Sequence, residues 1–294
     1  MPSAREIRVG GDEPVGLFSM NYNRPGPGIP KNAPPQKAVP RFFSILGRKF
    51  FDLVKLNLLF CVPAAAAAAL MYGLGTLTKL KFLVLLPVVA LSPFVAGLTF
   101  VTRNYAREEH AFILSDFKDA VRENWKPFLI NGAVCYLLFT VLSYSIPFYW
   151  QNSAGNPLFL VAASVCIAVS ALLVFSQYYV PVMIVTFRLN LRQIYKNALI
   201  FSILGLGRNL LVTALLAVLA FLLFLSSAVP LLLVLAALFI VFLLFAYCSF
   251  LINFAVYPLI NKTMIQPYQK QQREKQKQQG GGNGPPPTFM DSDK

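Results

Sequence analysis

The sequence offers one cluster of side chains that could carry out chemistry, the run Glu108-Glu109-His110. A histidine beside carboxylates can bind a metal ion or transfer protons. His110 is the only histidine of the chain and no HExxH spacing is present, so a metal site would lack a second imidazole. Arg103 and Arg107 lie about one helical turn away as partners for the glutamates. We interpret the cluster as ion pairs and a helix cap, and we expect no catalytic residue, metal site or cofactor.

Polar side chains inside the long apolar segments form a second group of candidates. At bilayer depth, amides and phenols hydrogen-bond between helices or line a polar path, and the sequence leaves both possibilities open. Ion-coupled carriers usually need an ionisable group at that depth, and these segments contain none. A proton- or sodium-driven transporter is therefore disfavoured. The residues that could line a polar path are Asn57, Asn131, Gln177, Tyr178 and Asn253.

Membrane-spanning helices are expected to carry these residues. Of the 294 residues, 56% are hydrophobic and only 13% are charged, whereas soluble domains carry roughly 25% charged residues. About 20 apolar residues of helix cross a bilayer. We therefore predict an all-α, polytopic membrane helix bundle within residues 41–262. Its six spans are expected at residues 56–74, 82–102, 128–150, 158–183, 206–226 and 231–257.

The distribution of lysine and arginine predicts the orientation. Basic residues near the ends of spans are retained on the cytoplasmic side. With both termini inside, 24 of the 26 basic residues are cytoplasmic, and only Lys79 and Lys81 are outside. We expect a multi-pass protein of the bacterial plasma membrane, and we attribute the net charge of +14 to lipid contact rather than to nucleic-acid binding.

Outside the spans, the sequence predicts two disordered ends and several amphipathic helices. Residues 1–40 and 263–294 are too rich in Pro, Gly, Gln and Lys to form a core, and residues 41–55 indicate an interfacial helix. Within residues 103–126 the expected N-cap is Ser115, and the apolar stripe is Leu114, Phe117, Val121 and Trp125. A second stripe consists of Leu191, Ile194, Tyr195, Ala198 and Leu199.

These two cytoplasmic segments are candidates for contact with lipid or with a partner protein. An amphipathic helix at the membrane face can rest on headgroups or dock into a groove of another protein. The candidate contact residues are Arg103, Asn104, Glu108, Glu109, His110, Phe117, Lys118, Val121, Trp125, Arg192 and Lys196.

Several runs of the sequence resemble the YesL-like family of bacterial membrane proteins, over roughly residues 20 to 262. They are NYNRPGPGIPKNAPPQ, RFFSILGRKFFDLVKLNLLF, LLPVVALSPFVAGLTFVTRNYAREEHAFILSDFKDAVRENWKPF and YYVPVMIVTFRLNLRQIYKNALIF. The stretch from Arg103 to Lys126 is the most specific, whereas the run Ala64–Ala69 and the polar tail depart from the family pattern. The family is typical of Firmicutes and has no established function. Its members often accompany carbohydrate ATP-binding-cassette (ABC) importers, and no catalytic residue comes with it.

Two hypotheses arise for the function. The first is a non-enzymatic accessory component of a transport system, with ABC importer subunits as partners. The alternative is a self-contained passive transporter or channel, whose path would run between the fourth and sixth spans and be lined by Gln177, Tyr178 and Asn253.

Overall fold

The computed structural model describes residues 37–279. The chain divides into two units, Met1–Arg41 and Phe42–Lys294. Most of the predicted N-terminal arm and the last fifteen residues of the predicted tail lie outside the described residues. The long apolar helices all belong to the second unit.

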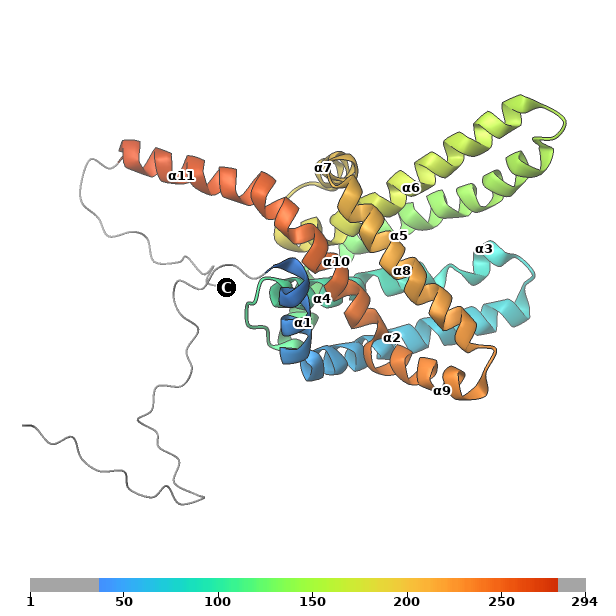
Figure 1. Cartoon of the computed structure of the whole chain (residues 1–294), viewed down its shortest axis with the longest axis horizontal. Helices are drawn as coiled ribbons and strands as arrows, with labels where there is room; N and C mark the ends of the chain where they lie inside the picture. The colour runs from blue at the N-terminus through green and yellow to red at the C-terminus, as the bar shows by residue number, and fades with distance from the viewer. Residues whose placement is uncertain (1–36, 280–294) are drawn as a thin grey trace, which may run out of the picture. The chain divides into compact units, whose positions relative to one another are not determined.

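The described chain is all-α, as the sequence predicts, and six helical stretches are long and apolar enough to cross a bilayer. They are Phe50–Leu77, Lys81–Ala106, Ile113–Asn152, Pro157–Thr186, Leu206–Ser226 and Pro230–Lys275. The helices are α1 (Ala38–Arg48), α2 (Phe50–Leu77), α3 (Lys81–Val84), α4 (Pro87–Ala106), α5 (Ile113–Asn152), α6 (Pro157–Thr186), α7 (Leu191–Leu204), α8 (Leu206–Ser226), α9 (Pro230–Phe239), α10 (Phe245–Ile260) and α11 (Gln266–Gln279) (Figure 1). Two short π-helical segments, η1 (Ile240–Leu244) and η2 (Asn261–Ile265), lie within the sixth stretch. The chain is a multi-pass helical membrane protein.

Local signals fix the turns between adjacent spans. Asn156 ends the turn after α5, and its Oδ1 accepts a hydrogen bond from the backbone N–H of Leu158 at 2.9 Å. Pro157 then occupies the first helical position of α6, where its missing N–H costs nothing. Pro230 plays the same part at the start of α9. Both turns lie where the sequence predicts them.

The predicted amphipathic segment within residues 103–126 is helical from residue 113 on, but it is not a separate short helix. Residues 113–126 form the first turns of the 40-residue helix α5, and residues 103–106 form the end of α4. Pro127 lies inside α5 and cannot donate a hydrogen bond to the backbone carbonyl of Glu123. Because Glu123 is exposed, water can hydrogen-bond to that carbonyl instead. The N-cap is Phe112 rather than Ser115. Asp116 reaches back instead, and its Oδ2 accepts from the Phe112 N–H at 2.9 Å.

The tail also differs from the prediction, because residues 266–279 are helical rather than disordered. Gln, Lys, Arg and Glu all favour helix, so a polar helix can continue directly from a buried one. A side-chain hydrogen bond joins successive turns of α11: Gln272 Nε2 donates to Tyr268 Oη at 2.7 Å.

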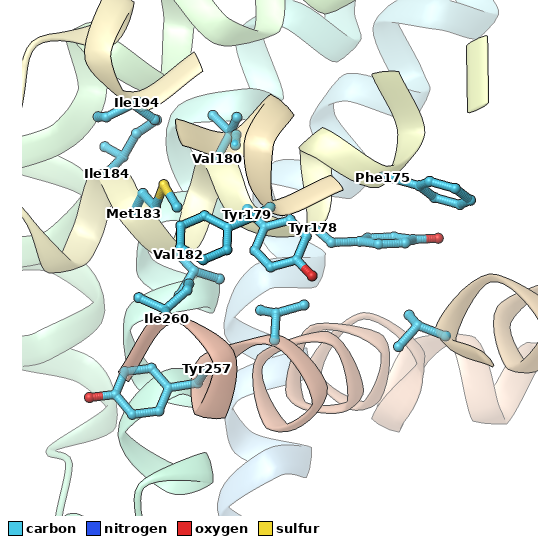
Figure 2. Packing of buried hydrophobic residues seen from close by; sticks show 14 of the residues in the cluster. Phe175, Tyr178, Tyr179, Val180, Val182, Met183, Ile184, Ile194, Tyr257 and Ile260 are labelled. Atoms are coloured by element: carbon cyan, nitrogen blue, oxygen red, sulfur yellow. The ribbon is translucent and has the colours of Figure 1, made fainter. Parts of the chain in front are cut away.

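Two hydrophobic clusters form the core, and α4 and α10 contribute to both. One cluster joins α6, α7 and α10, and Figure 2 shows Tyr179 and Met183 of α6 near Ile194 of α7 and Ile260 of α10. The other joins α1, α2, α4 and α10 around Phe250. Most buried residues of α4 and α6 lie in the C-terminal half of each helix.

The remaining halves of the spans expose large apolar side chains. Leu77, Phe224 and Leu158 are each more than 70% exposed, which a bilayer would cover. The α5–α6 hairpin is visible in Figure 1 as two neighbouring antiparallel helices. The N-in and C-in orientation stays a prediction.

Candidate functional site

The end of α4 is fixed by a buried arginine. Arg103 Nη1 donates to Val185 O at 2.7 Å and to Thr186 Oγ1 at 3.1 Å, and so a cation meets the C-terminal end of α6. Its Nη2 donates to Asn104 Oδ1 at 2.9 Å. Arg103 and Asn104 are 6% and 7% exposed. The two residues tie spans together, and the prediction that they contact a partner or lipid is wrong because they are buried.

The chain leaves α4 through a left-handed residue. Glu108 has φ 62°, the only positive φ of a non-glycine residue in the described part of the chain. Glu109 N–H donates to Asn104 O and Glu108 N–H donates to Tyr105 O, each at 2.9 Å, which is a Schellman ending of α4. Glycine is the usual residue at this position because it has no Cβ.

The ion pairs of this cluster are partly those expected. Arg107 pairs with Glu109 at 2.5 Å, but Glu108 pairs with Arg48 at 2.7 Å rather than with Arg103. The His110 ring lies edge-on to the Phe112 ring at 4.9 Å. Among the described residues no group of three or more His, Cys, Asp or Glu side chains could hold a metal ion.

The first predicted contact stripe is half inside the core. Phe117 is 5% exposed, and a Cβ at Gly97 of α4 would overlap its ring, so glycine permits this close packing. Val121 is half-buried, whereas Lys118 and Trp125 are exposed. Phe117 therefore stabilises the contact between α4 and α5, and its prediction as a partner or lipid contact is wrong.

The second predicted stripe holds α7 against the bundle. Ile194 and Ala198 are at most 2% exposed. Arg192 and Lys196 point away from this buried side and are exposed. In the part of the chain that the structure describes, no ion pair involves either residue.

Two of the predicted polar-path residues meet beside a cavity between α5, α6 and α7. Asn131 Nδ2 donates to Gln177 Oε1 at 3.0 Å, and Tyr195 Oη donates to Asn131 Oδ1 at 3.0 Å. Burial, and then the nearby Cys135, raise the pKa of Tyr195 to about 12, so its hydroxyl stays a donor at neutral pH. The cavity has a volume of about 180 Å³ and an almost entirely apolar lining. Sequence reasoning did not place Tyr195 in this network.

Asn57 serves a different contact. Its Nδ2 donates to Ile240 O at 3.0 Å and to Val241 O at 2.7 Å, and its Oδ1 accepts from Ala246 N–H at 2.9 Å. These backbone groups lie in and just after η1, where the helix widens. The amide side chain thus supplies hydrogen bonds to the backbone of the sixth span.

The other two predicted path residues lie in further separate contacts. Asn253 Nδ2 donates to Thr102 Oγ1 at 3.0 Å between α10 and α4. Tyr178 Oη lies 2.8 Å from Thr213 Oγ1 between α6 and α8. The five residues are therefore distributed over four helix contacts. Asn209 was missed by sequence reasoning because it follows a charged residue near a span end; its Oδ1 accepts from Tyr179 Oη at 2.8 Å.

Comparison with known proteins gives one match. The family model described as "Protein of unknown function, DUF624" matches residues 53–146, which run from α2 into α5. No match was found among curated proteins or among solved structures. This stretch of the chain is thus similar to a family without an established function, and the likeness brings no site residue with it.

Proposed function

We propose that this chain is a non-enzymatic accessory subunit of a membrane transport system, and that it holds a partner protein on the exposed face of α7. The resemblance to the YesL-like family makes carbohydrate ABC importer subunits the first partners to test.

The proposal rests on how α7 packs against the bundle. Ile194, Ala198 and Phe201 are buried against the bundle, and the Tyr195–Asn131 hydrogen bond adds a polar tie to α5. Arg192 and Lys196 are exposed on the same helix. A firmly held helix with two exposed cations suits recognition of an acidic surface, because little conformational entropy is lost on binding.

The polar residues of the spans favour a supporting role over conduction. Asn57, Asn253 and Tyr178 each make hydrogen bonds to a different neighbouring helix. Side chains engaged in this way stabilise helix packing.

The test is an affinity purification from native membranes in mild detergent, followed by identification of bound chains. The variant Arg192→Glu plus Lys196→Glu removes the basic face without touching the buried side of α7. The matched control, Lys270→Glu plus Lys275→Glu, reverses two exposed cations on α11. We expect transporter subunits with the wild type and the control, and their loss from the α7 variant. Recovery of the same chains with all three proteins, or of no partner with any, would refute the proposal.

A further inference from the structure

A second cavity lies where the end of α1 meets the end of α4. It has a volume of about 270 Å³ and is lined by Ile45, Arg48, Lys49, Tyr105 and Glu108. Lys49 immediately precedes the span Phe50–Leu77, and Tyr105 lies in the last turn of the span Lys81–Ala106. The cavity is thus at the boundary of two spans, at the level where lipid headgroups lie.

Tyr105, which lines the cavity, has a buried polar atom that lacks a partner. Tyr105 is 0% exposed, and its hydroxyl makes no hydrogen bond within the described chain. A buried hydroxyl without a partner costs free energy, which a bound acceptor would recover. A phenol hydroxyl can donate one hydrogen bond, so the missing group is an acceptor such as an anionic oxygen.

The charged side chains that line the cavity favour an anion. They are two cations, Arg48 and Lys49, and one carboxylate, Glu108, and Lys49 Nζ also pairs with Asp52 Oδ2 at 3.4 Å. Lys49 Nζ lies 5.1 Å from the centroid of the Tyr105 ring, so the ammonium group and the tyrosine lie side by side in the cavity lining. Arg48 uses one nitrogen on Glu108 and is 56% exposed, so other guanidinium donors are accessible.

Exposed apolar residues close in sequence to Arg48 and Lys49 indicate the source of the anion. Phe43 and Phe51, which flank Arg48 and Lys49 in the sequence, are 63% and 76% exposed. Exposed aromatic rings next to cations at a span boundary suit contact with acyl chains below a headgroup. A soluble anion would gain nothing from them.

We propose that this cavity binds the phosphate of a phospholipid headgroup. Arg48 and Lys49 balance its charge, Tyr105 Oη donates a hydrogen bond to a phosphate oxygen, and the acyl chains pass along Phe43 and Phe51. The site is independent of partner docking on α7.

Thermal unfolding of the purified full-length protein in an uncharged detergent tests the proposal. The added probes are phosphatidylglycerol, a glucosyl diacylglycerol with the same acyl chains but no phosphate, and inorganic phosphate. A ligand that binds only the folded protein stabilises it by RT ln(1 + [L]/Kd), so at equal concentrations the probe that binds more tightly raises the melting temperature more. We expect phosphatidylglycerol to raise the melting temperature of the wild type by several degrees more than the other two probes.

Variants then locate the effect. Arg48→Gln plus Lys49→Gln should lose at least half of the increment from phosphatidylglycerol, whereas Lys118→Gln plus Arg122→Gln, two exposed cations on α5, should keep it. Tyr105→Phe should melt higher than the wild type without lipid, because the unpartnered hydroxyl is gone, and should gain less from phosphatidylglycerol.

Two outcomes would overturn the proposal. One is a full increment in both the cation variant and Tyr105→Phe. The other is an equal increment from inorganic phosphate, which would assign the cavity to a free anion. If the cation variant does not fold, the opposite signs expected for Tyr105→Phe still decide the question.

Discussion

Replacing Asn57 with leucine should destabilise the protein by about 2 to 3 kcal/mol. The side chain makes three hydrogen bonds to the backbone of the sixth span: two to carbonyls of η1 and one from the Ala246 N–H. Interhelical hydrogen bonds in membrane proteins average about 0.6 kcal/mol each. Leaving the buried Ala246 N–H without its acceptor adds about 1 kcal/mol. Leucine keeps the branching of asparagine, so the loss is chiefly polar.

The assay is unfolding in mixed micelles, followed by circular dichroism, with hydrogen exchange of the Ala246 amide as a local readout. A loss of about 2 kcal/mol at this position corresponds to roughly thirtyfold faster exchange, since each 1.4 kcal/mol is tenfold. The matched control is Asn124→Leu, because Asn124 bonds only to Ala120 O within its own helix at 3.0 Å. If the Asn57 variant were no less stable than this control, and Ala246 exchange were unchanged, the bracing role of Asn57 would be refuted.

Three further predictions concern Arg103, Glu108 and Tyr195. Arg103→Met should lower the free energy of unfolding by about 2 to 3 kcal/mol, because it removes charge-assisted hydrogen bonds to the end of α6. Limited proteolysis between α6 and α7 should then be faster. Cleavage as slow as in the wild type would contradict the capping role of Arg103. In chemical unfolding, Glu108→Gly should be about 1 kcal/mol more stable than Glu108→Ala. Both variants lose the exposed ion pair with Arg48, but only alanine keeps the strain of a left-handed backbone. Equal stabilities would show that the backbone at residue 108 is unstrained. Tyr195 has a folded-state pKa of about 12, raised from 10.0, so its neutral hydroxyl contributes stability that is complete below pH 10 and is lost as the pH rises through 12. In pH-dependent melting, Tyr195→Phe should therefore lose less stability at alkaline pH than the wild type. An unchanged pH profile would contradict this contribution of Tyr195.

Charge spacing and apolar length were sufficient to predict the six spans. No charged side chain interrupts the long apolar segments, and Asn156-Pro157 and Pro230 mark turns by local chemistry that needs no tertiary information. The same reasoning treated residues 103–126 as separate from the third span, whereas α5 runs without a break from Ile113 through Pro127 to Asn152. Charge patterning marks where the apolar sequence begins, but a helix can extend beyond its apolar part when the polar turns face solvent.

The sequence indicated which residues belong to the candidate site but not how the fold arranges them. Phe117 and Trp125 belong to one apolar stripe in the sequence, yet Phe117 packs against Gly97 and Trp125 is 46% exposed. Periodicity identifies a face but not how far the neighbouring helix extends along it. Likewise, Arg103 is a plausible partner for glutamates in sequence, but the end of α6, 82 residues away, accepts its hydrogen bonds.

The uneven burial along α4 and α6 gives the two membrane leaflets different structural roles. Where the helices bury their side chains in one another, protein packing determines their separation, and changes in lipid have little to act on. Where Leu77, Leu158 and Phe224 are exposed, annular lipid completes the structure, and its hydrophobic thickness determines how these segments tilt. Bilayers of shorter or longer acyl chains should therefore deform one half of the protein and leave the other unchanged.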